Sequence, residues 1–117
     1  MNLYSPSPSA YSILTMVEFD PPPAPISLHS IIKACAEMSG VPPTDITGPY
    51  RTDKIVTARF VYYFLARRLT RKTLPQIAHH CGNRDHSTVI HGIAKVSANP
   101  EKYVNTIAAA KKLLGVE

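Results

Sequence analysis

The segment His79–His91, which reads HHCGNRDHSTVIH, contains four of the five histidines and one of the two cysteines of the chain. Four consecutive polar residues, 84–87, stand there where a run with helical apolar spacing begins. A helix start needs one capping oxygen, so four polar side chains exceed what capping requires. Histidine, cysteine and carboxylate groups bind metals, transfer protons or donate and accept hydrogen bonds to a partner. The segment therefore predicts a metal site, an active site or a binding surface.

A zinc site in this segment would use His79, His80 and Cys81 together with His86 or His91. Zinc in proteins takes four ligands in tetrahedral geometry. Consecutive residues of a helix point roughly 100° apart, so the first three side chains diverge instead of converging on one ion. The chain also lacks CxxC and HExxH spacings. We therefore expect no metal ligands and no cofactor.

An acid–base pair of Asp85 and His86 is the catalytic alternative in this segment. Neighbouring residues of a helix point apart, and no nucleophile accompanies the pair. The chain also lacks GxxxxGK followed by serine or threonine, the glycine-rich loop that binds the phosphates of ATP. We therefore expect no catalytic residues and no ATPase activity.

The elements around the segment favour a binding surface. Residues 73–76, TLPQ, have the form of a capping box and begin a helix that ends at Gly82. A tight turn over 82–84 leads into a second helix over 85–98, which completes a helix-turn-helix. In that motif the first turn of the second helix meets base edges in the DNA major groove. The side chains of that turn are short and polar, and Arg84 before them suits a phosphate or a guanine; they are Asp85, His86, Ser87 and Thr88.

The rest of the chain after residue 25 is also predicted to be helical. Ser27 and Gly40 mark the ends of one helix, and 44–46 predict a single turn. A long helix follows from about Thr52 to Leu69, and a last helix, capped by 99–101, runs to Leu114. No stretch alternates like a strand, so the fold class is all-α. The second helix of the motif should bury an apolar stripe, whereas for His91 a structural role and a DNA contact are both open; the stripe is Val89, Ile90, Ile93, Ala94 and Val96.

Length and composition indicate one small domain. The chain has 117 residues, enough for a single hydrophobic core. Residues 1–25 are rich in Pro and Ser and predict an extended tail, whereas 26–117 form the domain. Part of the tail, Tyr11–Phe19, is apolar enough to dock on the domain or on a partner protein. No segment resembles a membrane span or a signal sequence, and two isolated cysteines suit a reducing compartment. We therefore expect a cytoplasmic protein without a membrane partner.

Positive charge is concentrated in one part of the sequence. Residues 51–95 contain nine Lys and Arg against two Asp, a net charge of +7, whereas the remaining residues carry −2. Charge segregated in this way predicts a polyanion as partner. The alternative is a plain solvated basic face.

The stretch 82–96, GNRDHSTVIHGIAKV, resembles the signature GGRDHTTVLHAxxKI of the C-terminal DNA-binding domain (domain IV) of DnaA, a family of bacterial replication initiators. Residues 73–77 match the family's SLPEI-type segment. Residues 59–69 match a second family pattern, in which an arginine is followed after five residues by Leu-Ala, a lysine or arginine, any residue and a leucine. The resemblance spans about residues 27–98. Two positions depart from it. Asn83 replaces the second glycine of the turn, where Asn tolerates a left-handed backbone, and Phe60 replaces a residue that is often Gln, which leaves the exact DNA preference open.

The resemblance implies a helix-turn-helix bundle of about five helices, of the DnaA C-terminal or Trp-repressor-like type. It implies sequence-specific binding of double-stranded DNA at DnaA-box-like sites in origins or promoters, and hence a nucleoid-associated regulator of DNA replication or transcription. The implied base contacts are Asp85, His86, Ser87 and Thr88 in the major groove, Arg51 in the minor groove, and Arg59, which would meet a base or a phosphate nearby. The implied backbone contacts are Arg67 and Arg84, to which we add the basic residues Lys54, Arg71 and Lys72. The alternative is a protein-interaction adaptor that keeps the motif as a scaffold and binds a replication or transcription protein through the tail.

Overall fold

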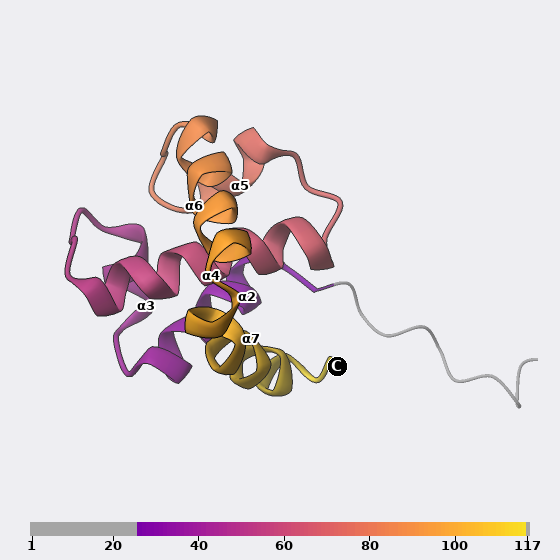
Figure 1. Cartoon of the computed structure of the whole chain (residues 1–117). Coiled ribbons are helices and arrows are strands. Elements are labelled where there is room, and N and C mark those ends of the chain that lie inside the picture. The colour runs from indigo at the N-terminus through magenta and orange to yellow at the C-terminus, as the bar shows by residue number, and fades with distance from the viewer. Residues whose placement is uncertain (1–25, 117) are drawn as a thin grey trace, which may run out of the picture.

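The computed structural model describes residues 26–116, and all regular structure in that range is helical (Figure 1). The all-α prediction is confirmed, with six helices instead of about five because the predicted single turn near Ile46 forms a helix of its own. None of the six combines the length and apolarity needed to cross a bilayer. The predicted tail, residues 1–25, lies outside the described residues. The helices are α2 (Leu28–Ser39), α3 (Pro43–Thr47), α4 (Asp53–Leu69), α5 (Leu74–His80), α6 (His86–Ala98) and α7 (Pro100–Leu114).

Helix α2 begins and ends where its capping residues predict. The Ser27 hydroxyl accepts a hydrogen bond from the Ser30 amide at 3.0 Å, and Gly40 ends the helix with a left-handed φ of 72°. Asn99 precedes the last helix as predicted, but its side chain does not cap that helix. Asn99 Nδ2 donates to the Lys95 carbonyl at 2.8 Å, so this side chain closes the end of α6 and does not cap α7. Unpaired carbonyls at a helix end need such partners, and the last turn of α6 finds one here.

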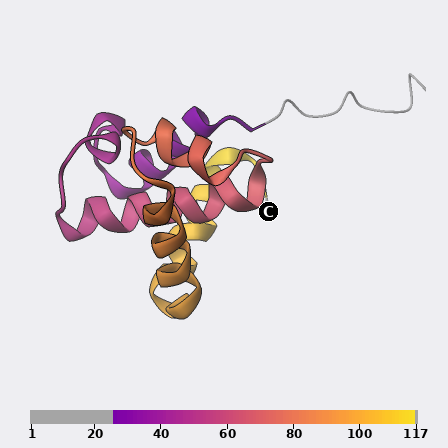
Figure 2. The same ribbon diagram turned by 90° about the horizontal axis from the view of Figure 1, so that it is seen from above.

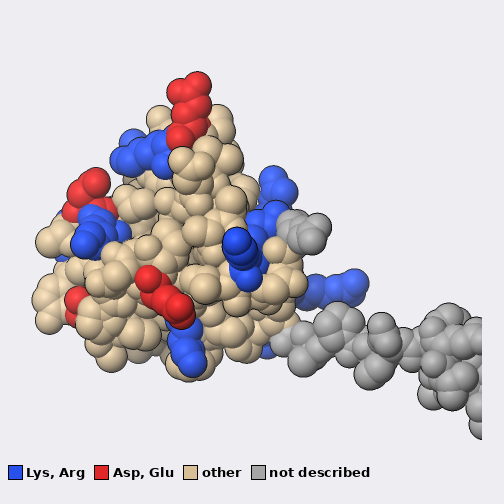
Figure 3. Space-filling model, turned by 90° about the horizontal axis from the view of Figure 1, so that it is seen from below, with Lys and Arg blue, Asp and Glu red and all other residues tan. Residues whose placement is uncertain are grey.

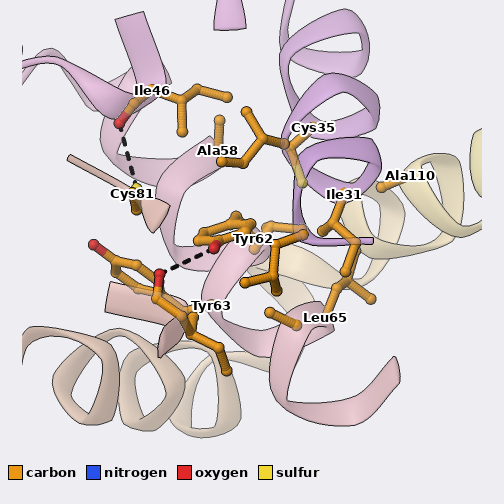
Figure 4. Packing of buried hydrophobic residues seen from close by; sticks show 14 of the residues in the cluster. Ile31, Cys35, Ile46, Ala58, Tyr62, Tyr63, Leu65, Cys81 and Ala110 are labelled. Atoms are coloured by element: carbon orange, nitrogen blue, oxygen red, sulfur yellow. Dashed lines mark hydrogen bonds between the residues drawn. The ribbon is translucent and has the colours of Figure 1, made fainter. Parts of the chain in front are cut away.

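Helix α4 lies at the centre of the bundle, and α6 lies across it in both views (Figures 1 and 2). Tyr62 and Tyr63 of α4 are fully buried, with ring centroids 5.6 Å apart (Figure 4). The Tyr62 hydroxyl donates to the Ile77 carbonyl at 3.0 Å and so connects α4 with α5. Because both helices of the predicted motif rest on α4, this helix fixes their positions.

The contact between α4 and α6 depends on Gly92. A Cβ atom at this position would lie 2.5 Å from Tyr63 Cδ2 and 2.9 Å from Phe60 Cδ1. Such distances are too short for carbon atoms that are not bonded to each other, so the absence of a side chain lets α6 approach the two rings.

The apolar stripe predicted for α6 is only partly buried. Val89 and Val96 are buried and Ile93 is half-buried, as expected. Ile90, half of whose surface is exposed, and Ala94, also exposed, contradict the prediction. These two residues are one helical turn apart and share the side of α6 that faces away from α4.

Candidate nucleic-acid interface

Helix α5, a tight turn and α6 form the predicted helix-turn-helix. The capping box at the start of α5 is present: Thr73 Oγ1 accepts from the Gln76 amide at 3.2 Å, and Gln76 Oε1 accepts from the Thr73 amide at 2.8 Å. In the turn, Gly82 and Asn83 both have left-handed φ values, 80° and 57°. The expectation that Asn83 keeps the turn is confirmed.

The turn lies directly against the end of α3. A Cβ atom on Gly82 would be 2.2 Å from the Thr47 carbonyl oxygen, a distance at which no side chain fits. Behind it, the buried Cys81 thiol faces the Ile46 carbonyl at 3.6 Å (Figure 4). The position of the turn is therefore set by backbone atoms of α3, a segment about 35 residues earlier in the chain.

The first turn of α6 presents polar side chains to solvent. Asp85 and His86 are well exposed, with 69% and 55% of their side-chain surfaces accessible, and Asp85 Oδ1 lies 3.5 Å from His86 Nδ1. No side chain caps the helix, because the Asp85 carboxylate instead accepts a hydrogen bond from the Ser87 hydroxyl. This bond, followed by weaker contributions that include the charge of His86, holds the pKa of Asp85 below its ordinary value. Ser87 is exposed and Thr88 half-buried. The turn can therefore offer hydrogen bonds outward.

The side chains of the histidine-rich stretch before the turn lie in different surroundings. His79 and His80 are exposed on α5, whereas Cys81 is buried. Within residues 26–116, no three His, Cys, Asp or Glu side chains come close enough to bind one ion.

An open groove of about 860 Å³ separates the first turns of α6 from the loop before α4. Arg51 belongs to the loop side of this groove and is exposed. On the α6 side, the His91 ring meets Phe60 edge to face, with centroids 5.9 Å apart. Thr88 and Arg84 complete that side, and none of the lining residues is Asp or Glu. A concave surface with this charge attracts anions.

Arg59, which we expected to contact a base, is buried. Only 6% of its surface is exposed. Its Nε donates to the Ile46 carbonyl at 2.9 Å, and Nη2 donates to the carbonyls of Gly48 at 3.1 Å and Tyr50 at 3.0 Å. Burial is the main cause that lowers the pKa of this guanidinium, and the charge of Arg84 adds to it. These donors of Arg59 are used within the domain, so the structure gives no support to its predicted base contact.

Arg84, predicted to contact the DNA backbone, also donates inward. It is half-buried, and Nη1 donates to the Cys81 carbonyl while Nη2 donates to the Gly48 carbonyl. The structure thus gives Arg84 an intramolecular role, and its phosphate contact stays a prediction.

The other predicted backbone contacts lie on the surface of the described domain. Lys54 at the start of α4, Arg67 near its end, and Arg71 and Lys72 before α5 are all exposed.

On the face seen from below in Figure 3, Lys and Arg are separated by uncharged residues and accompanied by acidic groups. That face lies opposite the end of the molecule at which α5 and α6 stand in Figure 1, and it lacks the charge segregation expected of a DNA-binding surface.

Two residues of α6 that sequence reasoning did not place on the interface are exposed beside its first turn. Ile90 lies one helical turn after His86 and therefore shares its outward face. His91, left open above, is exposed and lines the groove. The spacing of four residues from His86 to Ile90 is a signal that would have found the first of them.

Comparisons with known proteins agree with the helix-turn-helix geometry. The family described as bacterial dnaA protein helix-turn-helix matches residues 28–96. Chromosomal replication initiator protein DnaA of Campylobacter fetus is 42% identical over 72 residues, which cover 62% of this chain and 16% of that protein. The proteins of the same name from Ralstonia nicotianae and Limosilactobacillus reuteri are 35% and 36% identical over 77 residues, 66% of this chain. The chain thus spans less than a fifth of the length of these relatives, at 15% and 18% for the last two.

Proposed function

Because the chain belongs to the family of bacterial DnaA helix-turn-helix domains, we propose that it binds double-stranded DNA sequence-specifically at sites that resemble the DnaA box. The three relatives described above all bear the name chromosomal replication initiator protein DnaA. The bound sites would accordingly lie in replication origins or promoters. There the protein would act as a nucleoid-associated regulator of replication or transcription, without ATP hydrolysis by this domain.

The observation that carries the proposal is the exposed polar first turn of α6. Short side chains at this place hydrogen-bond base edges without holding the backbone away from the groove. His86 and Ser87 are exposed and Asp85 is held ionised, so both donors and acceptors are available. Thr88 adds a hydroxyl and a methyl group, and Ile90 adds an apolar surface that suits a thymine methyl.

The groove beside α6 supports a second contact with the same DNA. When α6 occupies a major groove of the DNA, the DNA strand at the edge of that major groove faces the protein groove lined by Arg84, Thr88 and His91. Arg51, on the far side of this groove, would then reach the adjacent minor groove, where narrow A·T tracts attract arginine. Four exposed basic residues would contact phosphates: Lys54, Arg67, Arg71 and Lys72.

The proposal is tested by titrating the protein with a DnaA-box duplex and a scrambled duplex of equal length at two salt concentrations. If about five phosphates are neutralised, log K falls with a slope near −4.5 against log salt, or roughly 500-fold between 50 and 200 mM. The box should bind at least about a thousandfold more tightly than the scrambled duplex. Equal binding of both duplexes would contradict sequence-specific recognition. A flat salt response would favour the adaptor function instead.

A further inference from the structure

Two arginines from different elements donate to the same short loop. Arg59 of α4 donates to the carbonyls of Ile46, Gly48 and Tyr50, and its Nη2 also approaches the Asp45 carbonyl at 3.3 Å. Arg84, in the turn before α6, donates to the Gly48 carbonyl as well. The Gly48 oxygen, with two lone pairs, therefore receives one guanidinium from each side.

The loop offers these carbonyls because α3 ends there. A helix leaves its last carbonyls without intrahelical partners, and α3 is only one turn long. The planar guanidinium presents several N–H donors in a fixed fork, which suits a set of converging oxygens better than an ammonium does. Without the guanidinium of Arg59, these carbonyls would lose a strong hydrogen-bond donor, at a cost in stability.

The arrangement places two positive charges close together in the domain, which costs folding free energy. Burial and the nearby charge of Arg84 both lower the pKa of Arg59, and within residues 26–116 no carboxylate pairs with either guanidinium. Buried charges without an opposite charge disfavour folding. The hydrogen bonds to the loop carbonyls offset this cost, so the two guanidinium groups and the loop hold one another in place.

The loop and the turn each lead directly to a residue of the proposed interface. Tyr50, whose carbonyl accepts from Arg59 at 3.0 Å, immediately precedes Arg51. Arg84 immediately precedes Asp85, the first polar residue of the α6 start. The shared Gly48 carbonyl thus fixes the loop of Arg51 and the start of α6 to a common point.

On the basis of the proposed function, we infer that Arg59 and Arg84 are positioning residues. They set the separation between Arg51 in the minor groove and α6 in the adjacent major groove, and the buried Arg59 does so without touching the DNA. The two grooves of a duplex lie at a fixed spacing, so a loop already ordered at that spacing binds without losing further conformational freedom.

The experiment uses Arg59→Lys, which keeps the positive charge but removes the fork. We expect about a tenfold loss of affinity for the box duplex, the equivalent of ordering one additional loop residue on binding. In an Arg51→Ala background the same substitution should cost less than about twofold, because the loop then has no contact to position. The slope of log K against log salt should stay at the wild-type value, since no phosphate contact is lost. Arg84→Lys should behave in the same way.

Arg68→Lys is the matched control. Arg68 is exposed on the same helix, where its guanidinium lies 4.9 Å from the Phe64 ring, and the substitution also keeps the charge. It should leave affinity unchanged in both backgrounds. Melting temperatures measured for all variants show whether each protein is folded at the assay temperature.

Two results would overturn the inference. One is an equal loss on Arg59→Lys with and without Arg51, which indicates a structural role or a contact independent of Arg51. The other is a lower salt slope, which indicates a phosphate contact. If the variants unfold, the Arg59 Nε–H signal in NMR spectra of the wild-type protein decides: it should keep its shift and its slow exchange when DNA is added. Failure of the wild-type protein to prefer the box would instead refute the proposed function.

Discussion

Replacing Gly82 by alanine should destabilise the domain by two separable effects. The first is backbone strain, because a residue with a Cβ atom at a φ of 80° costs about 1–2 kcal/mol. The second is overlap of the new Cβ atom with the Thr47 carbonyl oxygen, only 2.2 Å away. This oxygen belongs to the backbone and cannot turn aside, so the turn must move away from α3, and overpacking of this kind costs about 1–3 kcal/mol more.

Gly40→Ala is the control that isolates the first effect. Its φ of 72° is nearly the same, but nothing lies within 4 Å of the position a Cβ atom would take. Thermal unfolding followed by circular dichroism should place the melting temperature of Gly82→Ala at least about 4 °C below that of Gly40→Ala, at about 4–8 °C per kcal/mol for a domain of this size. Equal losses in the two variants would refute the reasoning from close approach. Because Gly82 positions α6, its variant should also bind the box duplex more weakly than Gly40→Ala does.

Three further predictions concern single side chains. His86→Ala should weaken binding to the box by about 1–3 kcal/mol and leave scrambled DNA unaffected, whereas Arg67→Ala should weaken both and reduce the salt slope by about one unit. Ser87→Ala should raise the pKa of Asp85 towards 3.8 in an NMR titration; the ionised Asp85 stabilises its turn above that pH, and the effect is lost as the pH falls through the lowered folded-state pKa. Burial raises the pKa of the Cys35 thiol to about 12, so a thiol reagent at neutral pH should label this residue only after denaturation.

Local signals in the sequence were sufficient for the helices. The capping box at Thr73, the hydroxyl cap at Ser27 and the glycine at position 40 act on backbone groups within a few residues, so their effect can be derived without the tertiary fold. The left-handed conformation of Asn83 belongs to the same class.

The role of Arg59 could not be derived in this way. A sequence rich in arginine indicates a basic surface, but burial of one guanidinium depends on carbonyls 9 to 14 residues away that α3 brings to it. The predicted burial of Ile90 was wrong for a related reason. Its hydrophobicity suggested the core, whereas its exposure depends on which side of α6 rests on α4.

The close contact at Gly92 determines the order in which residues can be substituted where α4 and α6 pack together. The family signature has alanine where this chain has Gly92, and the added methyl group would meet the fully buried Tyr63 ring. Grafting the α6 sequence of a relative onto this domain therefore first requires room where the Tyr63 and Phe60 rings now lie, whereas the reverse order passes through an overpacked intermediate. The same glycine that lets α6 rest on α4 thus makes its recognition helix difficult to exchange as a single module.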